Sequence, residues 1–153
     1  MSSAKKKVIV SACILGEQCR YDGKTKKLNA VTEALKEYEI IPFCPEAPLF
    51  GTPRERINVV EIDGQNRIIT DETNKDVTLR LEKEITAFMD EHKEVDKIVL
   101  KAKSPSCGYH TTPILNLDKE VQKLGSGIAA SMLSRRYKEI IIEDENSLSK
   151  LER

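Results

Sequence analysis

The stretch "IVLKAKSPSCG", residues 98–108, decides the fold that we predict from this sequence. It opens with Ile98, Val99 and Leu100 and runs directly into a loop that contains serine, proline, cysteine and glycine. A short apolar run rich in β-branched residues, bounded by such turn residues, is typical of a buried β-strand. The stretch therefore predicts a buried strand whose carboxyl end leads to Cys107.

The same placement of a cysteine occurs twice more in the chain. The apolar residues 8–10 precede Cys13, and residues 40–43 precede Cys44. In an open parallel sheet the carboxyl ends of the strands share one edge, and ligands bind there in the crevice where the strand order reverses. We therefore expect Cys13, Cys44 and Cys107 to converge in space. Cys19 lies in a polar loop after Cys13, and we predict a structural or spare role for it.

Helical patterns alternate with these strands. We predict helices over residues 30–38, over residues 76–92 and within residues 125–137, and a last strand at residues 140–142. Asp76 is placed to cap the second helix by accepting a hydrogen bond from an otherwise unpaired amide. Residues 59–70 read as a β-hairpin, because Asp63-Gly64 is a strong turn signal between two apolar runs.

This alternation predicts an α/β fold. We expect a mostly parallel sheet flanked by helices in a Rossmann-like three-layer arrangement, with the hairpin as an insertion. A length of 153 residues is that of one ordinary domain, so we predict a single α/β domain over residues 1–153.

Composition excludes several classes of protein. The 25 basic and 25 acidic side chains balance, so we expect no general attraction to nucleic acid or to an anionic membrane. No apolar run approaches the roughly 18 residues that span a bilayer, and no signal peptide is visible. We therefore predict a cytoplasmic protein, in which thiols stay reduced and cysteines serve as metal ligands, catalytic groups or core residues. The sequence indicates no oligomeric state.

Three cysteines that lie far apart in the sequence could together bind a metal centre, and their pattern favours some kinds of centre over others. The paired C-x-x-C knuckles of structural zinc sites are absent. A cubane iron–sulfur cluster on three cysteines would leave one iron open for a substrate. Soft thiolate ligands favour iron–sulfur, zinc or cuprous copper, and the spacing does not choose among them.

Polar residues accompany the cysteines. Glu46 follows Cys44 by two residues, and a carboxylate near a metal-bound substrate can move protons. Ser104 and Ser106 flank Pro105, where either hydroxyl is suited to bind a substrate heteroatom, to shuttle a proton or to stabilise a turn. The candidates for substrate contact are Tyr21, Asp22, Arg54 and Ser106.

These residues carry a family resemblance. The motifs "VSACILGEQCRYDG", "IIPFCPE", "GTPR", "DVT" and "SPSCG", in this order, resemble those of the thiouracil desulfurase family, formerly an uncharacterised bacterial domain family. The resemblance implies an α/β domain that holds a 4Fe–4S cluster on Cys13, Cys44 and Cys107. It also implies that Glu46 and Ser104 are the catalytic acid/base residues.

The resemblance further implies a non-redox reaction. The open iron would bind the sulfur of a thiolated nucleobase or similar small thiocarbonyl heterocycle, water assisted by Glu46 would add to the carbon, and hydrosulfide would leave. An exposed cluster of this kind is expected to be absent from some aerobically prepared protein. The alternatives are a non-catalytic sulfur-carrier or metal-binding domain that uses the same cysteines, with zinc as the other metal, and a thiol redox enzyme, which the absence of C-x-x-C disfavours.

Overall fold

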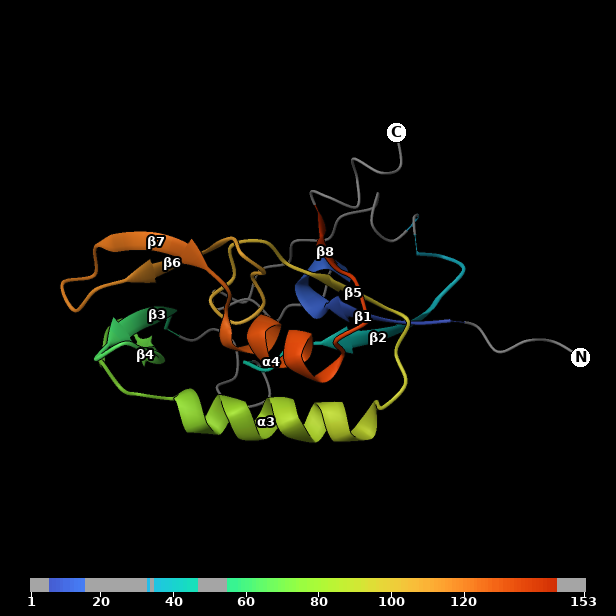
Figure 1. The fold of residues 1–153 in the computed structure, drawn as a ribbon, viewed down its shortest axis with the longest axis horizontal. Helices are drawn as coiled ribbons and strands as arrows, with labels where there is room; N and C mark the ends of the chain where they lie inside the picture. Colours follow the sequence, from blue (N-terminus) through green and yellow to red (C-terminus); the bar gives the residue numbers. More distant parts are fainter. Residues whose placement is uncertain (1–5, 16–32, 34, 47–54, 146–153) are drawn as a thin grey trace, which may run out of the picture.

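Two β-sheets organise the chain (Figure 1). The structure is a computed structural model that describes residues 6–15, 33, 35–46 and 55–145, without the side chains of residues 13 and 15. Within this part of the chain, sheet A has four parallel strands in the order β2-β1-β5-β8. Their bounds are β2 Glu39–Phe43, β1 Lys7–Ser11, β5 Lys97–Leu100 and β8 Ile142–Asp144.

Sheet A is covered on both faces, as expected for parallel strands. Successive side chains of a strand point to opposite faces. Accordingly, Ile9 and Ile98 belong to one buried cluster, whereas Val8, Val10 and Val99 belong to a second one. The predicted α/β class with a parallel sheet is thus confirmed.

Sheet B was not predicted as a sheet. In the described residues its order is β4-β3-β6-β7, with β3 parallel to β6 and the other pairs antiparallel. The predicted hairpin is present, with its turn at Asp63 (φ 52°) and Gly64 (φ 79°), but it forms half of sheet B rather than an isolated insertion. The bounds are β3 Ile57–Ile62, β4 Gln65–Thr70, β6 Thr112–Leu115 and β7 Val121–Gly125.

The sequence pattern hides β6 and β7 for physical reasons. Pro113 removes a backbone donor from β6, which argues against a strand in the sequence. All but the last residue of β7 is exposed, so no alternation of apolar and polar residues marks it.

Helices α3 (Thr78–Glu91) and α4 (Ile128–Arg136) pack beside each other along the sheets (Figure 1). The prediction of a helix over residues 76–92 is confirmed. Val77 is the residue before the first turn, yet Asp76 Oδ1 accepts a hydrogen bond from the amide of Thr78 at 3.0 Å, as expected of a capping carboxylate.

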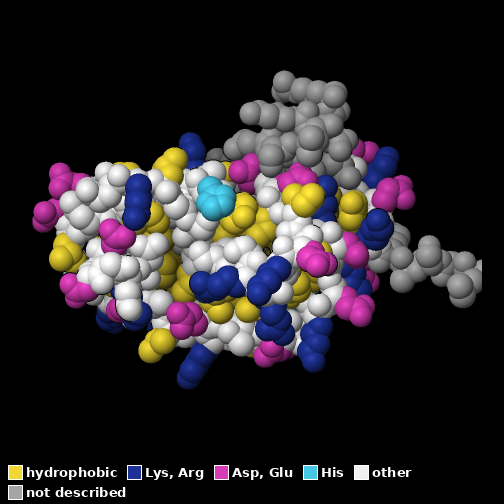
Figure 2. Space-filling view, in the orientation of Figure 1, with side chains coloured by type: hydrophobic (Ala, Val, Ile, Leu, Met, Phe, Trp, Pro, Cys, Tyr) yellow, Lys and Arg dark blue, Asp and Glu magenta, His cyan; other side chains and the backbone are white. Residues whose placement is uncertain are grey.

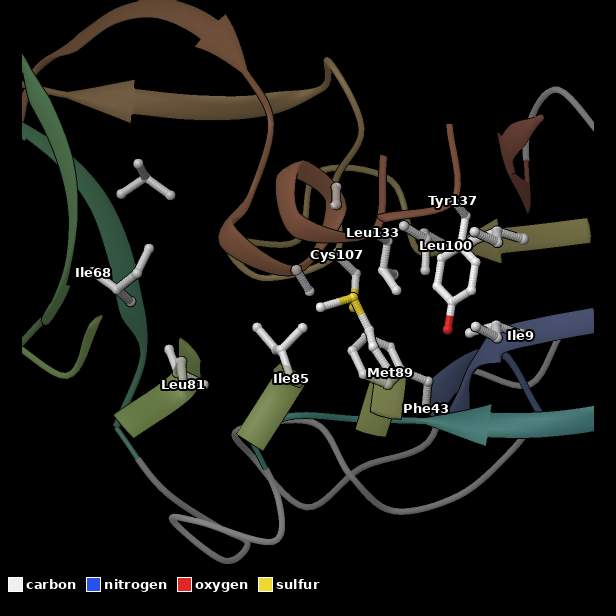
Figure 3. Packing of buried hydrophobic residues seen from close by; sticks show 14 of the residues in the cluster. Ile9, Phe43, Ile68, Leu81, Ile85, Met89, Leu100, Cys107, Leu133 and Tyr137 are labelled. Carbon is white, nitrogen blue, oxygen red and sulfur yellow. The ribbon is translucent and has the colours of Figure 1, made fainter. Parts of the chain in front are cut away.

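A single buried cluster joins both sheets to both helices (Figure 3). It contains Ile9 of β1, Ile68 of β4, Ile85 of α3 and Leu133 of α4, together with Cys107. A shared core of this kind supports the single-domain interpretation, which stays a prediction.

The predicted strand at residues 140–142 was misplaced, since β8 starts at Ile142. The chain leaves α4 through a turn in which the amide of Tyr137 donates to Leu133 O and that of Ile140 donates to Tyr137 O. Ile141 is 72% exposed. Of the predicted helix over residues 30–38, the structure describes Glu33 as helical and residues 35–37 as a turn, and the remainder lies outside the described residues.

The surface carries basic and acidic side chains interspersed with one another on the face drawn in Figure 2. No helix in the described ranges is both long and apolar enough to cross a bilayer.

Candidate active site

The strand order of sheet A reverses between β1 and β5. The chain passes from β1 to β2 on one side, and β5 and then β8 are added on the other. The carboxyl ends of β1 and β5 are joined by a hydrogen bond in which the Lys101 amide donates to Ser11 Oγ at 2.9 Å. This is the edge at which open α/β sheets bind ligands.

A pocket of about 420 Å³ lies at this edge. Such a volume is within the range of small-molecule sites. One wall, here called the sheet A wall, comes from the last residues of β1 and β2 and from the segments that follow β1, β2 and β5. The other, the sheet B wall, comes from β3, β6 and the residue before β3. The sheet A wall comprises Ser11, Ala12, Phe43, Cys44, Pro45, Glu46, Lys101, Ala102, Lys103, Ser104, Pro105, Ser106 and Cys107, and the sheet B wall comprises Arg56, Ile57, Asn58, Val59, Thr112, Pro113 and Leu115.

The loop that carries Cys107 is tightly hydrogen-bonded. Ser104 Oγ accepts hydrogen bonds from the amides of Ser106 at 3.2 Å and of Cys107 at 3.0 Å. Ser104 O accepts from the Gly108 amide at 2.9 Å and from Thr112 Oγ1 at 2.6 Å. The loop is therefore a rigid turn that presents Cys107, which is 5% exposed, at the boundary between pocket and core.

Close packing makes Gly108 necessary in this loop. A Cβ atom built at Gly108 would lie 2.1 Å from Thr112 Oγ1 and 2.8 Å from Ser104 O. No side chain fits at that distance, so glycine permits the turn directly after the cysteine.

Glu46 connects the loop after β2 to the loop after β5. Its carboxylate is buried, at 8% residue exposure, and Ser106 Oγ donates a hydrogen bond to Glu46 Oε2 at 2.7 Å. Ser106 Oγ also lies 3.2 Å from Ser104 Oγ. Since a hydroxyl has one proton to donate, a Ser106 that donates to Glu46 accepts from Ser104. The result is a directed chain from Ser104 through Ser106 to Glu46.

A buried ion pair fixes the start of the same loop. Lys101 Nζ lies 2.7 Å from Glu145 Oε2, and the side chains of Lys101 and Glu145 are 20% and 9% exposed. The second carboxylate oxygen, Glu145 Oε1, accepts from the Ala102 amide at 2.8 Å. Glu145 therefore uses both oxygens to hold residues 101–102 against the end of β8.

The structure brings together five of the predicted site residues. Cys44, Glu46, Ser104, Ser106 and Cys107 line the same pocket. Their predicted roles stay predictions. The backbone of Cys13 lies in η1 (Ala12–Leu15), directly after β1. Its side chain lies outside the described part of the structure, as do Cys19, Tyr21, Asp22 and Arg54.

Sequence reasoning missed several residues of the pocket. Lys101 carried a detectable signal, since it follows a predicted strand directly. Its partner Glu145 comes directly after β8, beyond the end of the predicted strand. Asn58, Thr112 and Leu115 carried none, because sheet B was not foreseen.

The described donors suit an iron–sulfur cluster. Two thiols, Cys44 and Cys107, line one pocket, and Ser11 and Ala12, which immediately precede Cys13, line it as well. Thiolates are the ligands that iron–sulfur clusters take. Among the described side chains no group of three histidine, cysteine, aspartate or glutamate residues is placed to hold a metal. The three-cysteine prediction needs the side chain of Cys13, so it is not tested by this geometry.

An α/β protein with a buried carboxylate and two cysteines at a strand-end pocket is an enzyme-like scaffold, and comparison with known proteins identifies its family. Residues 8–145 match the model of the 2-thiouracil desulfurase family. The chain belongs to this family, a family of desulfidases, as the motifs predicted.

Two relatives extend this result. The chain is 29% identical over 148 residues to YbbK, an uncharacterised protein of Bacillus subtilis strain 168, covering 90% of this chain and 96% of the relative. It also resembles the solved structure of the 4Fe–4S-dependent thiouracil desulfidase TudS, with a TM-score of 0.75 and 32% identity over 97% of this chain and 96% of the other.

Proposed function

We propose that this protein is a 4Fe–4S-dependent desulfidase that replaces the sulfur of a small thiolated heterocycle, such as a thiolated pyrimidine, by oxygen. The observation that carries the proposal is the hydrogen bond of 2.7 Å between Ser106 Oγ and Glu46 Oε2, in a pocket that Cys44 and Cys107 also line. Family membership and the similarity to TudS support the same conclusion.

Cys13, Cys44 and Cys107 would hold the cluster. With three protein ligands, such a cluster supplies an open Lewis-acid position for a thiocarbonyl sulfur. The described part of the chain contributes two of these thiols at the carboxyl edge of sheet A. The third follows β1, the strand hydrogen-bonded to both β2 and β5.

The overall reaction balances without electron transfer. A thiocarbonyl and one water give a carbonyl, hydrosulfide and a proton. The carbon–sulfur bonds break, the carbon–oxygen bonds form, and the carbon keeps its oxidation state. The protein must therefore orient water, accept a proton from it and return a proton to the departing groups, and it needs no redox partner.

Glu46 is the group suited to the proton transfers. Its buried carboxylate lies in the pocket beside the cysteine loops. A carboxylate in hydrogen-bonding reach of a bound water can accept the proton as the oxygen attacks carbon. Ser106 fixes the carboxylate by donating to Oε2, so the group has a defined position from which to accept a proton.

Ser104 completes the arrangement. Its oxygen accepts two backbone hydrogen bonds, which fixes the side chain, and its proton is directed at Ser106. A rotation of the Ser104 hydroxyl toward the pocket would let it donate to a substrate heteroatom or to the departing sulfur. Pre-oriented dipoles of this kind need little reorganisation during the reaction.

The test is anaerobic reconstitution of the full chain with iron and sulfide, followed by incubation with 2-thiouracil. Hydrosulfide and uracil are expected in equal amounts without an added reductant. Glu46→Gln is expected to lower kcat about 10²-fold or more, the usual contribution of a general acid–base group, while iron content and the visible absorption of the cluster stay at the wild-type level.

Two results would contradict the proposal. A reconstituted protein that carries a full cluster but releases no hydrosulfide from any thiolated base would be a carrier or binding domain. A colourless protein with stoichiometric zinc and no turnover would point to the zinc alternative.

A further inference from the structure

The sheet B wall of the pocket contains one amide side chain, that of Asn58 on β3. Ile57 and Val59, its neighbours in the strand, belong to the buried core. Because side chains alternate along a strand, Asn58 lies on the opposite face of the sheet. Pro113 and Leu115 of the adjacent strand β6 likewise alternate with the core residue Ile114. Asn58, Pro113 and Leu115 line the pocket, and so do Ile57, Val59 and Thr112 from the core-facing side of the two strands.

The orientation of the Asn58 amide is determined by Asp71. Asn58 Nδ2 donates to Asp71 Oδ1 at 2.9 Å. A carboxylate only accepts hydrogen bonds, so the amide nitrogen must face Asp71 and the amide oxygen must point elsewhere. The hydrogen bond from Asn58 is the foremost reason that the pKa of Asp71 is lowered, and Lys119 acts in the same direction.

Asp71 is itself held in place. Its amide donates to Arg56 O at 2.8 Å, which ties it to the residue before β3. Lys119 Nζ lies 3.4 Å from Asp71 Oδ1 and also donates to Asp71 O. Asn58 is half-buried and lines the pocket. Its amide nitrogen has a fixed partner in Asp71, so the amide oxygen is the group of this side chain that is suited to accept a hydrogen bond from a ligand.

The chemistry of the proposed substrate matches an acceptor at this position. In a thiolated pyrimidine the carbon that bears sulfur is bonded to a ring nitrogen, and in the thione form that nitrogen carries a hydrogen. Proteins read unstacked bases through hydrogen bonds of side chains to such edges. The sheet A wall supplies the reacting groups, so recognition of the ring edge falls to groups elsewhere in the pocket.

We propose that Asn58 is a specificity-determining residue whose amide oxygen accepts a hydrogen bond from the ring N–H next to the thiocarbonyl carbon. The inference rests on the proposed desulfidase function and names the feature that a substrate needs, a thioamide N–H. Thiocarbonyl compounds with that nitrogen alkylated are then poor substrates. Asp71 is a positioning residue that acts through Asn58.

The test compares 4-thiouracil with its N3-methyl analogue, in which a methyl group replaces the only ring N–H next to the thiocarbonyl carbon. Both are offered to the anaerobically reconstituted full chain. The wild-type KM is expected to be about tenfold higher for the methylated base, the effect of losing one hydrogen bond to a buried acceptor. The kcat values of the two bases are expected to agree within about twofold, because Asn58 binds ground and transition states alike.

Variants separate this role from a structural one. Asn58→Ala is expected to raise KM for 4-thiouracil about tenfold and to abolish the preference for the N–H base. Asp71→Asn, which no longer dictates the orientation of the amide, is expected to raise KM by about threefold. Asn66→Ala, at an exposed position of β4, is the matched control and should keep the wild-type preference.

The outcomes are distinguishable. A wild-type enzyme that accepts both bases equally, or an Asn58→Ala variant that keeps the preference for the N–H base, would overturn the role of Asn58 while leaving the desulfidase activity established. A wild-type protein that releases hydrosulfide from neither base, nor from 2-thiouracil, would overturn the proposed function and this inference together.

Discussion

The two walls of the pocket differ in what they contribute. The sheet A wall brings two cysteines and the buried carboxylate of Glu46, to which Ser106 donates a hydrogen bond. Ser104 in turn hydrogen-bonds Ser106 and the Cys107 amide. The sheet B wall brings mostly apolar residues together with Arg56, Thr112 and Asn58. The hydrogen-bond partner of Asn58, Asp71, lies outside the pocket lining. The side chains proposed to react thus lie at the carboxyl ends of the parallel strands of sheet A, whereas sheet B contributes a mostly apolar surface with a few polar contacts.

This difference has a kinetic consequence. Groups that act on the reacting atoms change kcat, and groups that bind ground and transition states equally change KM. Variants on the sheet A wall should therefore lower kcat, and variants on the sheet B wall should raise KM. The following predictions run from the largest expected effect to the smallest: the serine variants test this division, and the Glu145 and Asp71 variants test the contacts that hold each wall in place.

Ser104→Ala should have the largest effect. It removes the proposed proton-shuttling hydroxyl and the acceptor for two backbone amides of the turn. We expect kcat to fall about 10²-fold or more, as for a general acid–base group, with KM changed less. Steady-state kinetics of the reconstituted variant measure this. A variant with a normal kcat and a raised KM would contradict the claim that residues of the sheet A wall act on kcat.

Glu145→Gln should destabilise the start of the cysteine loop. The change leaves Lys101 without its counter-charge in a position where only 20% of its side chain is exposed. Breaking such a buried pair from one side costs about 3 kcal/mol. Denaturant unfolding measures the loss. The control is Lys123→Met, which removes the exposed ion pair with Glu61 and should leave the unfolding midpoint nearly unchanged. Equal losses of stability in the two variants would contradict the account.

Ser106→Ala should have an intermediate effect on rate. It deletes the hydroxyl that orients Glu46 but leaves the carboxylate in place. We expect kcat to fall about tenfold, the equivalent of one charge-assisted hydrogen bond, with little change in KM. Ser106→Thr keeps the hydroxyl and should recover most of the rate. Failure of threonine to restore activity, in a folded variant with a full cluster, would argue against the positioning role.

Asp71 should produce the smallest effect, visible as a pH dependence of stability. Its ordinary pKa of 3.8 is lowered in the folded protein, first by the hydrogen bond from Asn58 and then by Lys119. A lowered folded pKa means that the contribution to stability is present above the unfolded value and is lost as the pH falls through the folded value. The stability difference between wild type and Asp71→Asn should therefore shrink below about pH 4, and a constant difference from pH 7 to pH 2 would contradict this.

The sequence predicted the sheet A wall well and the sheet B wall poorly. The β-branched runs before Cys13, Cys44 and Cys107 are long enough and apolar enough to mark buried parallel strands, and their carboxyl ends must share an edge. Glu46, Ser104 and Ser106 could be predicted because each lies within a few residues of a cysteine. Their mutual hydrogen bonds could not, because they join loops that are 60 residues apart in the chain.

Sheet B was not predicted because it depends on tertiary contacts rather than on a local pattern of apolar and polar residues. Pro113 masks β6, and the exposed strand β7 has no apolar face. Asn58 looks like an ordinary polar residue of a hairpin until β6 pairs with β3 and places it in the pocket. The misplaced final strand has a similar cause, since a turn after α4 excludes Ile140 and Ile141 from the sheet.

The central claim is that three cysteines from three strand ends share one cluster next to Glu46. Iron and acid-labile sulfide per chain, measured after anaerobic reconstitution, test it most directly in the single variants Cys13→Ala, Cys44→Ala, Cys107→Ala and Cys19→Ala. We predict about four irons per chain for wild type and Cys19→Ala, as a cubane requires, and loss of the cluster and of hydrosulfide release in the other three. A full cluster that survives substitution of Cys13, Cys44 or Cys107 would contradict the account.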